Sequence, residues 1–300
     1  MSAIAVVGSV AFDTIETPTA RAVDVLGGSA THFAVAASYF VPVHLVAVVG
    51  EDFPPAAREF LAARGIDLTG LEVRPGRTFR WTGRYHEDMN VRDTLDLQLN
   101  VFANFQPRLG AATRAVPYVF LANIDPTLQE GVLAQFAKPA LVACDTMNHW
   151  IESARGPLEA LLPKIDLLIV NDEEARLLSG ERNVSRAARH ILAQGPRSVL
   201  IKRGEYGAIL FSPDSVFAVP AYPLESVFDP TGAGDSFAGG VMGHLAATGE
   251  HSETALRRAI VYGSVLASFM VEDFGSRRFH TLTRDDIERR YRQFVALTEF

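Results

Sequence analysis

Short apolar runs alternate with longer amphipathic segments along most of this chain. A run of four to six apolar residues is typical of a strand buried on both faces of a parallel sheet. We predict such strands at Ala3–Val7, His44–Val49, Tyr118–Leu121, Ala140–Cys144, Leu167–Val170 and Ser198–Lys202. Helices are predicted near Thr31–Phe40, Pro54–Ala63, Thr127–Phe136, Glu173–Leu178 and Val184–Ala193, and further along at Ala233–Thr248, Glu253–Val271 and Arg284–Leu297. Repeated strand-then-helix alternation predicts an α/β fold, with a mostly parallel sheet covered on both faces.

The segment Thr78–Val101 has a period of two instead. Phe79, Trp81 and Tyr85 alternate with polar residues, and Leu95, Leu97 and Leu99 do the same after a polar stretch. This pattern predicts an antiparallel hairpin with one apolar face. Such a hairpin is a candidate lid over a cleft or a candidate dimer surface, and a surface flap without function is the alternative. The segment from Asp13 to Gly27 is short, so we expect a lid to depend mainly on the hairpin.

The composition is that of a globular protein with a large core. Of 300 residues, 48% are hydrophobic and 21% charged, and the net charge is −7. This charge argues against a general nucleic-acid or membrane-surface binder. The only cysteine, Cys144, lies in an apolar run and is expected to be buried and inert, so no intrachain disulfide can form. The start of the chain reads as a strand and not a signal peptide, and we expect a cytoplasmic protein.

The most informative run is Asp229-Pro-Thr-Gly-Ala-Gly-Asp235, followed by an apolar, helix-compatible stretch. Small residues at Gly232–Gly234 allow the backbone to approach an anion, and a helix starting there directs its free N–H groups and positive dipole end at that anion. Asp235 in the first turn is, in isolation, an ordinary helix-capping residue. Two carboxylates beside a phosphate-sized nest nevertheless match what phosphoryl transfer needs, namely donors for the migrating group and an acceptor for the incoming hydroxyl proton.

The nine residues Asp229–Phe237 resemble the second signature of the ribokinase-like PfkB carbohydrate kinases. The resemblance implies a three-layer α/β/α sandwich with a small β-sheet lid, here one domain over residues 1–300 with lid elements near 14–26 and 78–103. It implies an ATP-dependent phosphotransferase acting on a hydroxyl of a small sugar. Asp235 would be the general base, and Gly232, Ala233 and Gly234 the anion hole. Mg²⁺ is implied as a cofactor, K⁺ is a further candidate, and the lid is a candidate homodimer surface.

Further matches concern the phosphoryl acceptor. Gly8-Ser-Val-Ala-Phe-Asp13 resembles the family segment whose Asp binds substrate hydroxyls, although Asp13 can also simply cap a turn. Gly27 and Gly28 open a stretch similar to the first family signature, in which His32 replaces the usual Asn. Because His and Asn offer different hydrogen bonds, this departure puts the substrate in doubt more than the reaction. Arg84 of the hairpin is a further candidate substrate contact.

Other matches concern ATP and metal ions. The resemblance implies an ATP site that includes Asn171, Lys202, Gly204, Thr231, Gly232, Gly234 and Ser264. Lys202 stands where the family commonly has Thr, and it can reach a phosphate or merely end a strand. Glu174 would place Mg²⁺ through water, in keeping with the reluctance of Mg²⁺ to lose its hydration shell. Asp229 is a candidate ligand of a monovalent cation.

Three other functions are alternatives. A nucleoside kinase of the adenosine type would use the same machinery on a different acceptor, and Phe12, Phe33, Trp81 and Tyr85 are either lining for a base pocket or ordinary packing. A dinucleotide-dependent oxidoreductase is disfavoured because no Gly-x-Gly-x-x-Gly follows the first strand. A nucleotide-binding regulator without catalysis is disfavoured by the intact Asp235.

Overall fold

The larger of two sheets forms the centre of the protein. The computed structural model describes residues 2–299. The strand order is β14-β13-β12-β11-β10-β9-β1-β4-β5, and β6 also pairs with β4. All pairs are parallel except those that attach β13 and β14. The bounds are β1 Ile4–Val7, β4 Val43–Gly50, β5 Ile66–Asp67, β6 Leu71–Arg74, β9 Tyr118–Leu121, β10 Leu141–Asp145, β11 Leu167–Asn171, β12 Ser198–Lys202, β13 Ala208–Phe211 and β14 Val216–Val219. The predicted mostly parallel sheet is confirmed.

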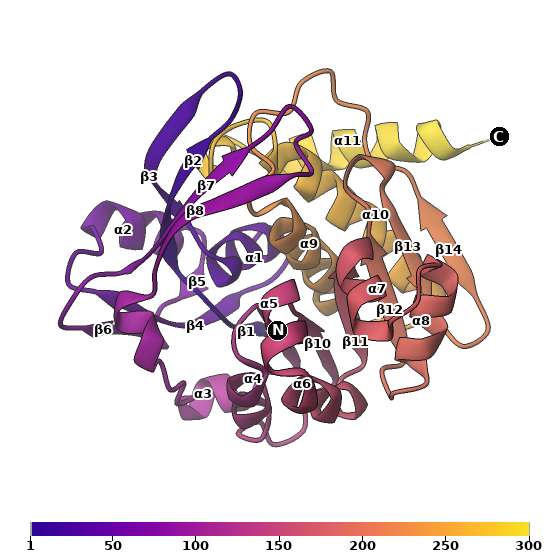
Figure 1. Ribbon diagram of the computed structural model, residues 1–300, viewed down its shortest axis with the longest axis horizontal. Helices are drawn as coiled ribbons and strands as arrows, with labels where there is room; N and C mark the ends of the chain where they lie inside the picture. The colour runs from indigo at the N-terminus through magenta and orange to yellow at the C-terminus, as the bar shows by residue number, and fades with distance from the viewer. Residues whose placement is uncertain (1, 300) are drawn as a thin grey trace.

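Two apolar cores lie on opposite faces of this sheet, which makes the three-layer sandwich (Figure 1). Successive side chains of a strand point to opposite faces; accordingly Ile4 and Val6 enter one core, and Ala5 and Val7 the other. The first core is completed by α1 Ser29–Ala37, α2 Pro55–Ala63, α9 Ala233–Thr248, α10 Glu253–Met270 and α11 Arg284–Thr298. The second is completed by α4 Pro126–Leu133, α5 Asn148–Ser153, α6 Arg155–Leu161, α7 Asp172–Ser179 and α8 Val184–Leu192.

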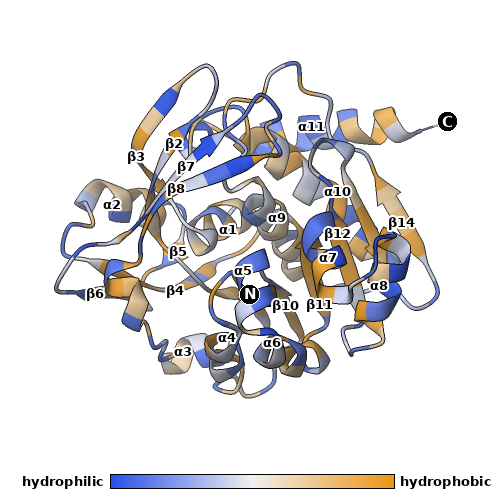
Figure 2. Ribbon diagram, in the orientation of Figure 1, coloured by the Kyte–Doolittle hydropathy of each residue, from blue (hydrophilic) through white to orange (hydrophobic). Residues whose placement is uncertain are grey.

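Short elements connect these layers. The helix α3 Ala111–Arg114 precedes β9, and four 3₁₀ turns cover Asn100–Asn104, Leu162–Lys164, Gly204–Tyr206 and Arg277–His280. Within residues 2–299, no helix is long and apolar enough to cross a membrane. Figure 2 shows the central strands mostly in hydrophobic colours, whereas the second, smaller sheet carries more hydrophilic ones.

The smaller sheet joins the two segments that the sequence presents as separate lid elements. Its order is β3-β2-β7-β8, with β2 Ala11–Glu16, β3 Arg21–Gly27, β7 Phe79–Tyr85 and β8 Arg92–Gln98. The central pair β2/β7 is parallel, and each strand forms an antiparallel pair with its outer neighbour. The expectation that this sheet depends mainly on the hairpin is therefore wrong, because β2 and β3 provide half of its strands. Asp13 lies inside β2 and not at the end of a strand.

The two faces of the small sheet differ. On the inner face, Ile15 and Tyr85 pack with Phe274, which follows α10. On the outer face, Arg84 is paired with Glu16. The apolar face predicted for the second strand is not buried, since Leu95, Leu97 and Leu99 are 44%, 54% and 42% exposed.

Candidate active site

The first turn of α9 forms a backbone nest. Gly232 precedes the helix with φ 75°, a left-handed conformation that favours glycine. The N–H of Ala233 donates to the carbonyl of Pro230 at 3.2 Å, so this amide is already used. Among the described residues, no backbone carbonyl accepts from the N–H of Gly234 or Asp235. Two amides at the positive end of a 16-residue helix therefore remain available to an anion.

Each glycine of the nest adjoins a side chain that was predicted to belong to the site. A Cβ at Gly232 would clash with the imidazole of His32. A Cβ at Gly234 would lie 2.8 Å from Nζ of Lys202, which ends β12. The ammonium group of Lys202 therefore lies directly against the nest, where it adds positive charge.

Asp235 is partly exposed, yet enough protein surrounds it to alter its ionisation. Burial raises the pKa of Asp235 to about 6, against the opposing effect of the positive charges of Lys202 and Arg92. A carboxyl group with this pKa is mostly ionised at neutral pH and can accept a proton, which suits a general base.

Asp13 lies near the same carboxylate. Burial raises the pKa of Asp13 to about 8, and the negative charges of Asp229 and Asp235 add to this effect. The Asp13 side chain occupies the space that a Cβ at Gly27 would need. Gly28 precedes α1 with φ 96°, and a Cβ there would lie 2.5 Å from the carbonyl oxygen of Ser9. Both glycines are thus needed where the loop passes the Asp13 side chain and the Ser9 backbone.

His32 is buried with 2% exposure, and neither ring nitrogen has a hydrogen-bond partner in residues 2–299. Burial lowers the pKa of His32 to about 4, so the imidazole is neutral at physiological pH. A neutral imidazole offers one donor and one acceptor. Unpaired buried polar atoms are costly, so a ligand that pairs with this ring would relieve that cost.

Asp229 links the nest to a second loop. One carboxylate oxygen accepts from the N–H of Thr231 at 2.8 Å, and the other accepts from the N–H of Gly275 at 2.9 Å. The side chain is fully buried, and burial raises its pKa. Thr231 is also joined to the small sheet, because its hydroxyl lies 3.0 Å from that of Tyr85.

Asn171 and Glu174 form a capping box at the start of α7. Asn171 Oδ1 accepts from the N–H of Glu174, and Glu174 Oε2 accepts from the N–H of Asn171, both at 2.7 Å. No hydrogen bond in the described chain uses Glu174 Oε1, which leaves one carboxylate oxygen for a metal-bound water. An oxygen that accepts a hydrogen bond from a metal-bound water fits Mg²⁺, which keeps much of its hydration shell. Burial raises the pKa of Glu174, while Lys202 lowers it.

The remaining predicted ATP residues lie on two sides of the nest. A Cβ at Gly204 would clash with Asn90 of the β7–β8 turn, so the small sheet also touches this loop. Ser264 is buried in α10, where the adjacent Gly263 packs against Phe237 and Gly240 of α9. Ser264 therefore lies beside the part of α9 that follows the nest, and not beside the nest itself.

Asp145 and Arg92 are near the site but were missed in the sequence. Asp145 ends β10, and burial together with the charge of Asp235 raises its pKa well above the usual range. A carboxylate directly after a buried strand was the available signal. Arg92 begins β8 opposite Tyr85 on the inner face, and its charge lowers the pKa of Asp235 and of Glu174. Only the strand register shows that the Arg92 side chain points towards the site.

The structure does not bring Arg84 to this group. Arg84 is paired across strands with Glu16, three positions after the pair of Asp13 and Trp81. Because this offset is odd, Arg84 projects from the opposite face of the sheet. Its guanidinium group binds the Glu16 carboxylate at 2.8 Å. The substrate contact predicted for Arg84 is therefore not supported by its position.

The fold and this nest define a nucleotide-dependent phosphotransferase. The family model described as "pfkB family carbohydrate kinase" matches residues 1–281. The chain is 30% identical over 251 residues to a cytidine kinase from Thermococcus kodakarensis, covering 80% of this chain and 87% of that one. The chain belongs to the PfkB family of carbohydrate kinases, as the resemblance of its glycine-rich run implied.

Solved structures agree on the fold. A nucleoside kinase from Methanocaldococcus jannaschii superimposes with a TM-score of 0.78 at 21% identity, covering 98% of this chain and 99% of that one. A fructokinase from Vibrio cholerae bound to fructose, ADP and calcium gives 0.78 at 18% identity, covering 96% and 98%. The predicted ribokinase-like sandwich with a separate small sheet is thus confirmed.

Proposed function

We propose that this kinase transfers the γ-phosphoryl group of ATP to a primary hydroxyl of a small sugar or of the ribose of a nucleoside. The observation that carries the proposal is the position of Asp235 at the nest, where free amides and the Lys202 ammonium lie beside a carboxylate whose pKa is raised to about 6. Donors for a phosphoryl group and an acceptor for a proton are what this transfer requires.

In the proposed reaction, the carboxylate of Asp235 takes the proton of the acceptor hydroxyl. The oxygen forms a bond to the γ-phosphorus as the bond to the ADP oxygen breaks. The N–H groups of Gly234 and Asp235 and the ammonium of Lys202 stabilise the charge on the transferring group. The N–H of Ala233 is turned to Pro230, so the anion hole rests more on its neighbours than the sequence predicted.

The acceptor would be held by Asp13, by the close backbone at Gly27 and Gly28, and by the unpaired imidazole of His32. The small sheet would exclude water that competes for the phosphoryl group. Its contacts through Tyr85 to Thr231 and through Asn90 to Gly204 support this role. A nucleoside is the second candidate acceptor, and the similarity to a cytidine kinase favours it.

ATP would extend from the nest towards Gly204 and Ser264. Mg²⁺, when bound, would neutralise phosphate charge, and Glu174 with Asn171 would orient its water ligands. In the described residues, no three His, Cys, Asp or Glu side chains are grouped so that they could hold a metal ion. Asp229 is buried without a cationic side chain within ion-pair distance in residues 2–299, and K⁺ near it remains a prediction.

A screen of ADP formation tests the proposal. Sugars, sugar phosphates and nucleosides are each supplied with ATP and Mg²⁺, and the phosphorylated product is identified by mass spectrometry. We expect at least one pentose or nucleoside to stimulate ADP formation, with one molecule of phosphorylated product formed for each ADP. ADP formation that no acceptor stimulates would contradict the proposed transfer.

A homodimer through the small sheet is a separate proposal. The exposed Leu95, Leu97 and Leu99 on and beside β8 support it. We expect sedimentation to give a dimer mass for the wild type and a monomer mass for Leu97→Glu. A monomer mass for the wild type at the same concentration would contradict it.

A further inference from the structure

Four aromatic residues were candidates for a base pocket, and three of them have other roles. Phe33 is fully buried and stacks on Phe120 with ring centroids 4.1 Å apart. Phe12 packs against Phe53 with 6% exposure. Tyr85 has 4% exposure and its hydroxyl lies against that of Thr231. Trp81 is the member of this set that keeps part of its surface open.

Trp81 lies beside Asp13. The two residues are partners in the parallel β2/β7 pair, so their side chains project from the same, inner face of the small sheet. Neighbouring strands lie about 4.8 Å apart. The backbones of Asp13 and Trp81 are therefore about one strand spacing apart, and both side chains start from the same face.

The orientation of the indole is fixed by its surroundings. A Cβ at Gly83 would clash with the indole ring, which shows that the ring lies over the backbone at Gly83. The indole N–H donates to Thr94 Oγ1 at 3.1 Å, and the Arg92 guanidinium lies 5.9 Å from the ring centroid. A ring held against the backbone and fixed at one edge is a preorganised flat surface, which loses little entropy when a second ring stacks on it.

We propose that Trp81 is the stacking surface for the base of a nucleoside acceptor whose ribose is held at Asp13. The inference rests on the proposed phosphoryl transfer and narrows its acceptor class. The base is bonded directly to the ribose, so a ribose at Asp13 places a base beside the neighbouring strand. Stacking does not read hydrogen-bond edges, and therefore accepts more than one base. A free pentose has no group for this surface.

Tryptophan fluorescence tests binding without catalysis. The chain contains two tryptophans, Trp81 and Trp150, so wild type is compared with Trp81→Phe. Cytidine, adenosine and ribose are titrated in turn in the presence of a non-hydrolysable ATP analogue. We expect saturable quenching of the wild type by at least one nucleoside, no quenching by ribose, and loss of the nucleoside signal in Trp81→Phe. Quenching that persists in Trp81→Phe, or no response to either nucleoside, would overturn the inference.

Affinities from calorimetry separate stacking from packing. Trp81→Ala should raise the Kd of the nucleoside about tenfold or more, as expected for a lost stacking partner, whereas Trp81→Phe should keep it within about threefold. Thr82→Ala, one residue along on the outer face, is the matched control and should leave binding unchanged. Equal loss of nucleoside and ribose binding in Trp81→Ala would indicate a structural role only and contradict the inference.

The outcome is distinguishable from failure of the proposed function. If wild type phosphorylates free pentoses but no nucleoside, phosphoryl transfer stands and the role of Trp81 is wrong. If no acceptor is phosphorylated, the fluorescence titration still decides whether a nucleoside stacks on Trp81.

Discussion

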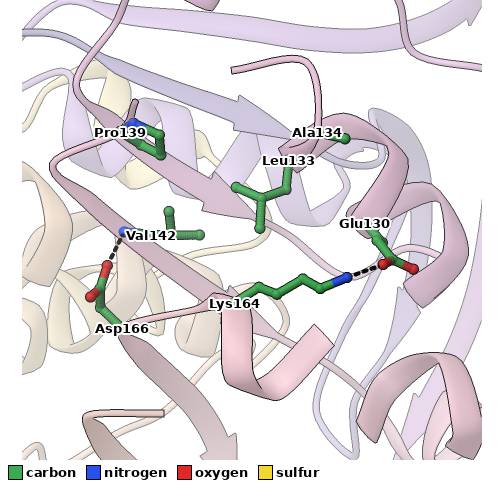
Figure 3. A pocket seen from close by; sticks show the side chains of 7 residues that line it. All are labelled: Glu130, Leu133, Ala134, Pro139, Val142, Lys164 and Asp166. Carbon is green, nitrogen blue, oxygen red and sulfur yellow. Dashed lines mark hydrogen bonds and ion pairs between the residues drawn. The ribbon is translucent and has the colours of Figure 1, made fainter. Parts of the chain in front are cut away.

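Acidic side chains gather at both ends of the large sheet, but in different states. At the amino ends of β10 and β11, a cavity of about 380 Å³ is lined by Glu130, Lys164 and Asp166 among others. Figure 3 shows its charges in pairs, Lys164 with Glu130 and Asp166 with the N–H of Val142. Near the carboxyl ends, Asp145 of β10, Asp13 of the small sheet and Asp235 of α9 form no such ion pair within the described residues.

This difference separates structural from functional carboxylates. The paired groups at the amino end bind existing partners and leave little for a ligand. The carboxylates at the other end have raised pKa values because the fold desolvates them, and at Asp235 this effect outweighs the opposing charges of Lys202 and Arg92. A protein can tolerate the energetic cost of desolvated carboxylates where a ligand or a reaction uses these groups. The cavity of Figure 3 is therefore a poorer candidate site than the nest.

The largest effect is expected for Asp235→Asn. Loss of the general base should lower kcat by about 10²- to 10⁴-fold. ATP-analogue binding should change little, because the nest amides and Lys202 remain. Turnover is measured by ADP formation and binding by calorimetry. Turnover near that of the wild type would remove Asp235 from the proposed role.

Asp13→Asn should weaken acceptor binding, with KM raised by about 10- to 100-fold, as expected when a buried hydrogen-bonding group loses its partner. The same change should stabilise the protein at alkaline pH. The folded-state pKa of about 8 exceeds the ordinary 3.8, so the wild type loses stability as the pH rises from about 4 to about 8. Melting temperatures at pH 6 and pH 9 should show a stabilisation by Asn that grows with pH. An equal shift at both values would contradict the raised pKa.

The pH profile of kcat should report Asp235 directly. Because its pKa is about 6, the wild-type rate should fall about tenfold per unit below that pH as the base is protonated. Lys202→Met removes a charge that lowers this pKa, so the acidic limb should move to higher pH by about one unit. An unmoved limb, measured with saturating ATP, would show that Lys202 does not act on the base.

The smallest effect is expected at the amino end. Asp166→Asn keeps an oxygen that can accept from Val142, and it loses an ion pair to the exposed Arg197. Stability should fall by at most about 1 kcal/mol, and kcat should stay within about twofold of the wild type. It is the matched control for Asp235→Asn. A large loss of turnover would erase the contrast between the two ends.

Local pattern alone was sufficient for much of the fold. The predicted bounds of β9, β12 and α9 agree with the structure, because each depends on a contiguous apolar run or on a glycine-rich helix start. These features are encoded by neighbouring residues, whose conformational preferences and spacing can be read directly.

Long-range pairing decided the rest. The parallel pairing of β2 with β7 joins residues 68 positions apart, and its register places Trp81 on the same face as Asp13 and Arg84 on the opposite face. The approach of Asp145 to Asp235 and of Arg92 to both Glu174 and Asp235 likewise depends on which strands are neighbours. A shift of one residue in a strand exchanges its two faces, so a period-two pattern gives the alternation but not which set of side chains faces the site. Only the assembled sheets fix that choice.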